Sequence, residues 1–278
     1  MKRMDGKVVL VTGAGRGLGW GIARAFGLEG AKVCATDVDE KELTATSAVI
    51  QADGTDLISR HLDVAEPGEY NRVVGQVLST WDRLDVLVHA AAIMPQISFE
   101  NTSRDRWQRE LQISLDGLFN GVKSVWDTMK QQGGGHIMGV ASGASYRGSA
   151  NQLAYVVGKH GQEGFMKVLS AESAPFNIAA NTMSPGKTIK PTSMTLAQAE
   201  IVPEDVRSTW NDPTELGQAF VWLASQPPNR FNGLSFSAGS IVDTIAEGGW
   251  DFEFAPDKVT GNPDEFRARL QWQTGSHR

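Results

Sequence analysis

The sequence contains almost no cysteine. Only Cys34 is present among the 278 residues, which excludes an internal disulfide and a metal site built from cysteines. Cys34 lies within an apolar run, where a thiol is usually buried and inert, although a catalytic thiol at this position is an alternative. We therefore expect a reducing compartment and no metal site.

Long apolar runs are missing as well. No window reaches the roughly 20 apolar residues of a membrane-spanning helix. The N-terminal apolar stretch Val8–Val11 is too short for the core of a signal peptide. The sequence thus predicts a soluble, cytoplasmic protein with no membrane partner.

The sequence has fewer positively than negatively charged residues. The 26 Lys and Arg residues are outnumbered by 32 Asp and Glu residues, the formal net charge is −6, and there is no basic run. This balance disfavours binding to nucleic acid or to anionic membranes. The 41% of hydrophobic residues suffice for one sizeable core in a chain of this length. Two domains are possible on length alone, but no linker separates them.

Short valine-rich runs alternate with helix-like stretches along most of the chain. Strands are predicted at Val8–Thr12, Lys32–Thr36, Leu57–Leu62, Val86–Ala90, His136–Val140, Asn177–Met183 and Leu234–Ser237. Helices are predicted at Gly17–Glu29, Glu40–Ala52, Tyr70–Trp81, Arg104–Lys130 and Ala154–Ala174. Parallel strands need helical crossovers and are buried on both faces. The pattern therefore predicts a three-layer, doubly wound α/β fold with a mostly parallel sheet of about seven strands.

Two stretches interrupt this alternation. Residues 187–211 are rich in Thr, Ser, Pro and Met, and predict a flexible loop with a short helix. Residues 248–278 form a tail containing Trp250, Phe252, Phe254, Phe266 and Trp272. We interpret residues 1–247 as the catalytic domain and residues 248–278 as an extension of it. The tail either packs on its own subunit or crosses to a neighbour and covers that subunit's pocket.

A glycine-rich turn joins the first strand to the first helix. Its sequence runs from Thr12 to Gly19 with the spacing T-G-x-x-x-G-x-G. Glycines at such a turn let backbone N–H groups approach a ligand, and the helix N-terminus favours a pyrophosphate. The predicted nucleotide-binding residues of the turn are Gly13, Arg16, Gly17, Leu18 and Gly19.

Asp37 ends the second predicted strand. A carboxylate there can accept hydrogen bonds from the adenosine ribose and repel a 2′-phosphate, which favours NAD over NADP. Arg16 argues the other way, because a guanidinium can pair with that phosphate. Asp37 lies closer to the expected ribose position, so NAD is the predicted cofactor.

Tyr155 and Lys159 stand at i and i+4 on one predicted helix, and Ser142 follows the fifth strand. A nearby ammonium lowers the pKa of a phenol, which would let Tyr155 act as acid or base. Ligands in doubly wound sheets bind at the carboxyl ends of the strands, so Ser142 is expected to hold a substrate oxygen.

Together these motifs resemble the single-domain short-chain dehydrogenases/reductases, over roughly residues 5–245. The resemblance implies a Rossmann fold in which Tyr155 and Lys159 also bind the cofactor. It further implies an adenine site at Asp63 and Val64, backbone contacts at Ala90, and a nicotinamide site at Pro185, Gly186 and Thr188. It implies a homodimer or homotetramer, paired through the fourth and fifth long helices.

Two positions depart from the family pattern. The family's Asn-Asn-Ala-Gly after the fourth strand is replaced by His89–Ala92, and its helical asparagine, which holds a proton-relay water, aligns with Ser114. Ser114 is therefore a candidate catalytic residue with an altered relay. His89 is either a new catalytic group or, as we favour, a space-filling residue.

The function predicted is an NAD-dependent oxidoreductase that interconverts a secondary alcohol and a ketone by hydride transfer. A non-redox lyase or epimerase that keeps NAD bound, and a catalytically silent NAD-binding scaffold, are the alternatives. On the substrate side, Met94, Met194 and Trp210 suggest an apolar wall, and Lys187 and Lys190 are either carboxylate ligands or solvated lysines.

Overall fold

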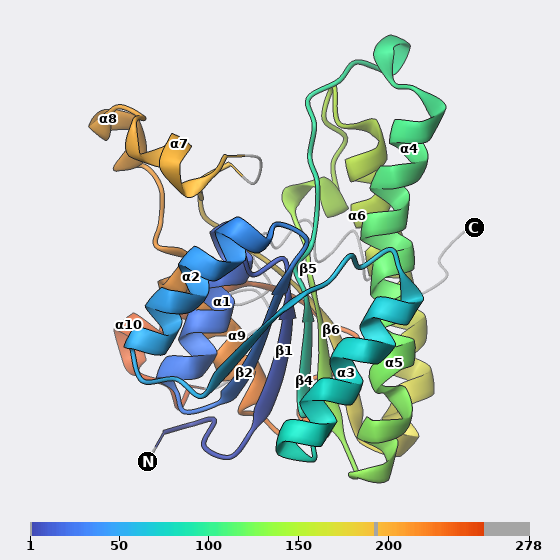
Figure 1. Cartoon of the computed structure of the whole chain (residues 1–278), viewed down its shortest axis with the longest axis vertical. Helices are drawn as coiled ribbons and strands as arrows, with labels where there is room; N and C mark the ends of the chain where they lie inside the picture. Colours follow the sequence, from blue (N-terminus) through green and yellow to red (C-terminus); the bar gives the residue numbers. More distant parts are fainter. Residues whose placement is uncertain (1, 192–193, 253–278) are drawn as a thin grey trace, which may run out of the picture.

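The computed structural model describes residues 2–191 and 194–252. Within them, one seven-stranded sheet has the order β3-β2-β1-β4-β5-β6-β7, and every neighbouring pair is parallel (Figure 1). The predicted doubly wound α/β fold is thus confirmed. The strands are β1 (Val8–Thr12), β2 (Lys32–Asp37), β3 (Leu57–His61), β4 (Val86–His89), β5 (Gly135–Val140), β6 (Ile178–Ser184) and β7 (Ser235–Ser237).

Helices cover both faces of the sheet (Figure 1). One face carries α1 (Gly17–Leu28), α2 (Glu40–Ala52), α9 (Pro213–Ala224) and α10 (Ala238–Gly248); the other carries α3 (Pro67–Trp81), α5 (Gly117–Gln131) and α6 (Leu153–Ser173). Each face has its own apolar core. Val9 and Val11 of β1 point into the first core, and Val8 and Leu10 into the second. The alternation follows from the two-residue period of a strand, and it explains the unbroken apolar runs in the sequence.

The long helix predicted over Arg104–Lys130 is not a single α-helix. It consists of α4 (Arg104–Leu111), the π-helical turn η2 (Gln112–Asp116) and α5. A π-turn adds one residue to a helical turn and is frequent at functional sites. The hydrophobic pattern of η2 continues into α4 and α5, so the periodicity of the side chains did not reveal the π-turn. Ser114 lies within this turn.

The C-terminal third contains more helix than predicted. The segment 187–211 holds two short helices, α7 (Leu196–Glu200) and α8 (Glu204–Arg207), rather than one, and α10 was not predicted. The ring of Phe252 stacks on Trp222 of the same chain, with centroids 4.8 Å apart. This start of the tail packs on its own subunit. Phe254, Phe266 and Trp272 lie outside the described residues.

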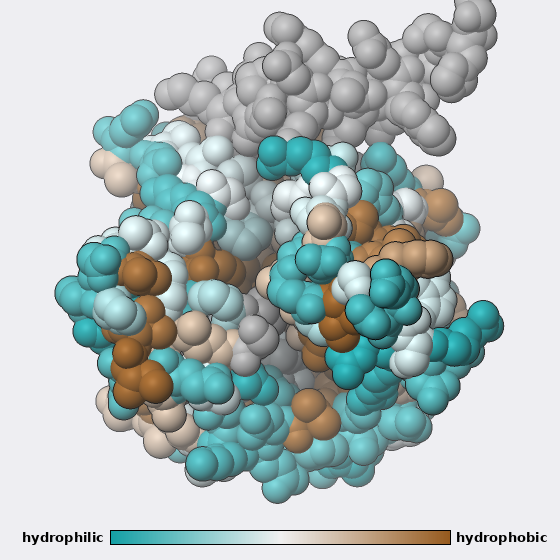
Figure 2. Space-filling model, turned by 90° about the horizontal axis from the view of Figure 1, so that it is seen from above, coloured by the Kyte–Doolittle hydropathy of each residue, from teal (hydrophilic) through white to brown (hydrophobic). Residues whose placement is uncertain are grey.

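All strands end at the same side of the molecule, where α7, α8 and the start of α4 rise above the sheet (Figure 1). Viewed from this side, the surface is hollowed between two lobes that both carry apolar side chains (Figure 2). Within the described residues, no helix combines the length and the apolar character needed to cross a membrane. The parallel topology therefore brings the predicted site residues to one end of the sheet.

Candidate active site

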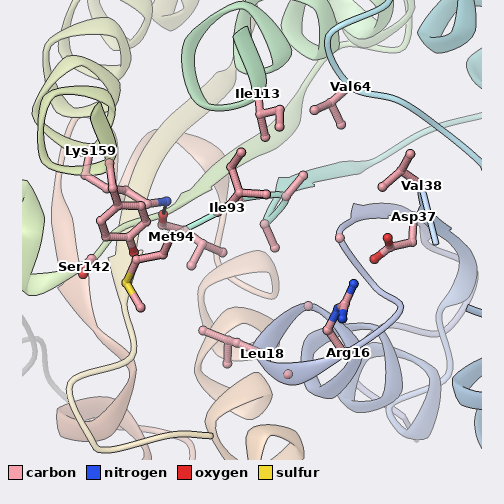
Figure 3. Close-up of a pocket in the computed structure, with 18 of the residues that line it drawn as sticks. Arg16, Leu18, Asp37, Val38, Val64, Ile93, Met94, Ile113, Ser142 and Lys159 are labelled. Carbon is pink, nitrogen blue, oxygen red and sulfur yellow. Dashed lines mark hydrogen bonds between the residues drawn. The ribbon is translucent and has the colours of Figure 1, made fainter. Parts of the chain in front are cut away.

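A cavity of about 610 Å³ opens at this end of the sheet. In Figure 3, Asp37, Val38 and Arg16 lie at one end of it, and Ser142, Lys159 and Met94 at the other. The predicted site residues that line it are Gly13, Arg16, Gly17, Leu18, Gly19, Asp37, Asp63, Val64, Ala90, Ser142, Tyr155, Lys159 and Pro185. The predicted residues Ser114, Gly186 and Thr188 are not among the lining residues.

The glycine turn between β1 and α1 is shaped by backbone conformation. Gly13 and Gly17 have φ angles of +67° and +55°, in the region that favours glycine. A Cβ atom on Gly13 would lie 2.8 Å from the backbone of Ala91, and one on Gly19 would collide with the Gly13 carbonyl oxygen. The turn therefore leaves an uncovered backbone cradle at the N-terminus of α1, which fits a pyrophosphate.

Asp37 lies at the end of β2 beside this turn. Its carboxylate accepts hydrogen bonds from the Gly15 and Asp39 N–H groups, each at 2.9 Å. Arg16 is held by Asp39, with Nη2 3.3 Å from Oδ2. The carboxylate is thus fixed at the cavity wall, whereas the guanidinium is partly neutralised by its neighbour.

Asp63 and Val64 follow β3 and line the same end of the cavity. Arg109 of α4 pairs with Asp63 at 2.6 Å, and the Asp63 carboxylate also accepts from the Ala65 N–H. Arg109 itself lines the cavity. This ion pair, which joins two segments far apart in sequence, was not predicted.

Ser142 and Tyr155 meet at the other end. A hydrogen bond to Ser142 lowers the pKa of Tyr155, but burial outweighs it, and the net pKa is raised above the ordinary value for tyrosine. The Lys159 ammonium is not among the causes of this shift, so its predicted lowering of the Tyr155 pKa stays a prediction. The ammonium lies 5.7 Å from the centre of the Tyr155 ring and donates hydrogen bonds to Val140 and Gln162.

Lys159 is 2% exposed. Its Nζ donates to the Val140 carbonyl oxygen at 2.5 Å and to Gln162 Oε1 at 3.1 Å. Burial lowers the pKa of Lys159 to about 8, while the nearby Glu163 carboxylate opposes this shift. In mildly alkaline solution, Lys159 is therefore neutral in a fraction of the molecules.

His89 points into the second core and is 1% exposed. Burial lowers its pKa to about 3, and its Nδ1 lies 3.4 Å from the Tyr70 hydroxyl. It is not among the residues lining the cavity, which favours the space-filling interpretation. Thr12 Oγ1 accepts from the N–H groups of Ala90 and Ala91, both at 3.2 Å, so the altered stretch keeps backbone bracing.

The substrate side contains residues that the sequence did not reveal. Besides Met94, the residues Ile93, Pro95, Ile189 and Pro191 line the cavity. These residues belong to loops after β4 and β6, and loop composition carries no signal of which side chains face a cavity. Burial and the nearby Arg16 charge lower the pKa of Lys190, so this lysine lies toward the end of the cavity that holds Arg16 and Asp37. Met194 and Trp210 are not among the described lining residues, and Lys187 pairs with Asp243 at 2.6 Å.

Comparisons with known proteins identify the family. Residues 7–201 match the family model described as short chain dehydrogenase. The chain belongs to the short-chain dehydrogenase family. Membership agrees with the all-parallel sheet and with the glycine turn at the cavity.

Its relatives are named for oxidation of alcohols. A 3-alpha-(or 20-beta)-hydroxysteroid dehydrogenase of Mycobacterium tuberculosis is 32% identical over 267 residues, covering 94% of this chain and 98% of the relative. A cyclopentanol dehydrogenase of Comamonas testosteroni is 30% identical over 258 residues, covering 90% and 99%. A solved structure from Burkholderia xenovorans, assigned to the short-chain dehydrogenases/reductases, has a TM-score of 0.76 at 28% identity and covers 85% of this chain and 96% of that one. The chain is thus a short-chain dehydrogenase/reductase that acts on a small-molecule alcohol or ketone with a nicotinamide cofactor.

Proposed function

We propose that this dehydrogenase interconverts a secondary alcohol and a ketone with NAD, using Tyr155 as the acid and base. The observation that carries the proposal is the single cavity, which joins a glycine cradle and Asp37 at one end to Ser142, Tyr155 and Lys159 at the other. The cofactor and the reacting oxygen would then share one enclosed space.

The residues at the first end fit NAD. The cradle formed by Gly13, Gly17 and Gly19 would hold the pyrophosphate, and Asp37 would accept from the adenosine ribose. Asp37 would also repel a 2′-phosphate, and Arg16 is already paired with Asp39. Both features support NAD rather than NADP.

The residues at the second end supply proton chemistry. When bound, the nicotinamide accepts or supplies the hydride. The Ser142 hydroxyl would hold the substrate oxygen, and the Tyr155 hydroxyl would give a proton to a ketone or take one from an alcohol. The Lys159 ammonium, at the edge of the same cavity, would favour the phenolate form of Tyr155.

The walls around this end are apolar. Met94, which lies beside Ser142 and Lys159 in Figure 3, and its neighbours Ile93 and Pro95 follow β4 and line the cavity. Such walls suit an alicyclic secondary alcohol, the kind of substrate named for the hydroxysteroid and cyclopentanol dehydrogenases. The proposal therefore extends to alicyclic alcohols as the substrate class.

The test is a panel of alicyclic and linear secondary alcohols, each with NAD and with NADP, followed by absorbance of the reduced nicotinamide. We expect NADH to form with at least one alicyclic alcohol, and faster than NADPH. Bound NAD without any turnover across alcohols and ketones would contradict the proposal and favour a silent scaffold or a non-redox relative.

We also propose a homodimer or homotetramer paired through the outer faces of α5 and α6. Phe119 is 52% exposed and Val168 is 61% exposed on these helices. Light scattering of Phe119→Glu and Val168→Glu variants tests it, with a shift toward the monomer as the expected result. Variants that keep the wild-type mass would contradict pairing through these helices.

A further inference from the structure

Behind the Lys159 ammonium lies a buried link that the chemistry above does not use. Gln162, one helical turn beyond Lys159 on α6, is 1% exposed. Its Oε1 accepts from Lys159 Nζ at 3.1 Å, and its Nε2 donates to the backbone carbonyl of Ser114 at 2.8 Å. The amide therefore connects the ammonium to η2 through two hydrogen bonds.

The carbonyl that accepts from Gln162 belongs to the π-turn η2. The Ser114 hydroxyl donates to the Glu110 carbonyl at 2.8 Å, while the Ser114 carbonyl itself faces α6. The two elements are in close contact, because a Cβ on Gly158 would collide with Ser114 Oγ. A buried carbonyl needs a donor, and Gln162 provides it.

The ammonium of Lys159 has three donors. Val140 and Gln162 accept two of them, which leaves the third for the cavity that Lys159 lines. The amide of Gln162 accepts a hydrogen bond through its oxygen and donates one through its nitrogen. An apolar side chain at this position would leave the Lys159 ammonium and the Ser114 carbonyl each with one hydrogen bond fewer. The orientation of the third donor thus depends on Gln162.

We propose that Gln162 is a positioning residue that ties the Lys159 ammonium to the Ser114 carbonyl and so aims its remaining donor at the reacting groups. The inference rests on the proposed role of Lys159 in the oxidoreductase. The Gln162 amide then occupies the position between Lys159 and η2 where the family resemblance implies a water molecule. An amide keeps its protons, so Gln162 orients Lys159 and does not relay protons through this side.

Three titratable groups face Lys159 from the elements around it. Tyr155 and Glu163 share α6 with it, and His89 on β4 is close enough for the Lys159 charge to lower its pKa. All three stay unchanged in a Gln162 variant. A change in the titration of Lys159 would therefore report the loss of the amide contact.

The first experiment measures the titration of Lys159 directly by NMR of protein carrying ¹³Cε-lysine, with the signal assigned from Lys159→Arg. Because one charge-assisted hydrogen bond is lost, Gln162→Met should lower the Lys159 midpoint by about one pH unit. Gln162→Glu keeps an acceptor oxygen and should restore the midpoint to the wild-type value or above. Gln132→Met, which removes an amide that bridges the backbone of Leu84, is the matched control and should change nothing.

An unchanged midpoint in Gln162→Met, or an equal fall in Gln162→Glu, would overturn the inference, since packing alone would then explain the contact. The NMR titration of Lys159 does not require turnover, so its outcome can be distinguished from that of the test of the proposed function. Where the wild type oxidises an alcohol, Gln162→Met should lower kcat about 10- to 100-fold through a misplaced lysine. KM for NAD should stay within about threefold, because the glycine cradle is untouched.

Discussion

The two ends of the cavity are built in different ways. The part of the cofactor end around the glycine turn belongs to one β-α-β unit, in which backbone geometry at Gly13 and Gly19 and one carboxylate at Asp37 form the surface. The catalytic end is assembled from η2, the end of β5 and α6, and it depends on buried polar side chains such as Lys159 and Gln162.

This difference has a consequence for substitution. At the cofactor end, an added methyl group on Gly13 or Gly19 collides with the backbone of Ala91 or Gly13, whereas at the catalytic end the loss of one polar atom leaves its partner unsatisfied. Binding and turnover should therefore be separable by single substitutions.

The largest expected effect breaks the catalytic end alone. Tyr155→Phe removes the proton-exchanging hydroxyl and should lower kcat by about 10³- to 10⁴-fold. NAD affinity, measured by quenching of protein fluorescence, should change little. Tyr146→Phe is the matched control, because the Tyr146 hydroxyl donates to Glu163 and does not line the cavity. Substantial turnover by Tyr155→Phe would remove Tyr155 from its proposed role.

A second substitution breaks the cofactor end alone. Gly19→Ala would press its methyl group against the Gly13 carbonyl and distort the cradle. Overpacking of this kind costs about 1–3 kcal/mol, so we expect NAD affinity to fall about 10- to 100-fold. Gly75→Ala on α3 is the control, since nothing lies within 4 Å of an added Cβ there. Equal NAD affinity in both variants would show that the cradle does not hold the cofactor.

A third substitution changes the preference of the cofactor end and leaves its shape largely intact. Asp37→Ala removes the carboxylate that we propose to accept from the ribose, and should shift the ratio of kcat/KM for NAD to that for NADP by about tenfold or more toward NADP. Asp53→Ala removes a carboxylate that pairs with Arg24 at the surface, and serves as the control. A ratio that stays constant would reject NAD as the preferred cofactor on these grounds.

The sequence predicted the position of the glycine turn and of Asp37 for a physical reason. Thr12–Gly19 and Asp37 are adjacent to strands with strong apolar patterns, so local signals also place them in space. The roles of Ser142, Tyr155 and Lys159 were proposed from spacing, and the structure brings all three to one cavity.

What the sequence did not reveal depends on long-range packing. The partner of Lys159 is Gln162, and the partner of Gln162 is a carbonyl in a π-turn that interrupts a continuous helical pattern. Likewise, Arg109 reaches Asp63 only because the fold brings α4 next to the segment that follows β3. Side-chain periodicity identifies faces and elements, but it does not specify which buried polar groups meet.

The smallest effect concerns His89, which lies buried at the end of β4 and is not among the residues that line the cavity. Its pKa of about 3 in the folded chain lies below the value of 6.5 expected after unfolding, so the unfolded chain alone binds a proton as the pH falls below 6.5. Between pH 7 and pH 5 this difference should remove about 2 kcal/mol from the free energy of unfolding. The buried His136, with a pKa of about 4, adds a loss of the same sign.

His89→Asn should therefore lose about 2 kcal/mol less than the wild type over this pH range, as measured by urea unfolding at each pH. The slope with pH is the deciding quantity, because Asn also changes the contact with Tyr70 and can shift the stability at pH 7 by itself. Equal slopes for His89→Asn and the wild type would mean that His89 takes up its proton in the folded chain. The interpretation of His89 as a buried, space-filling residue would then be wrong.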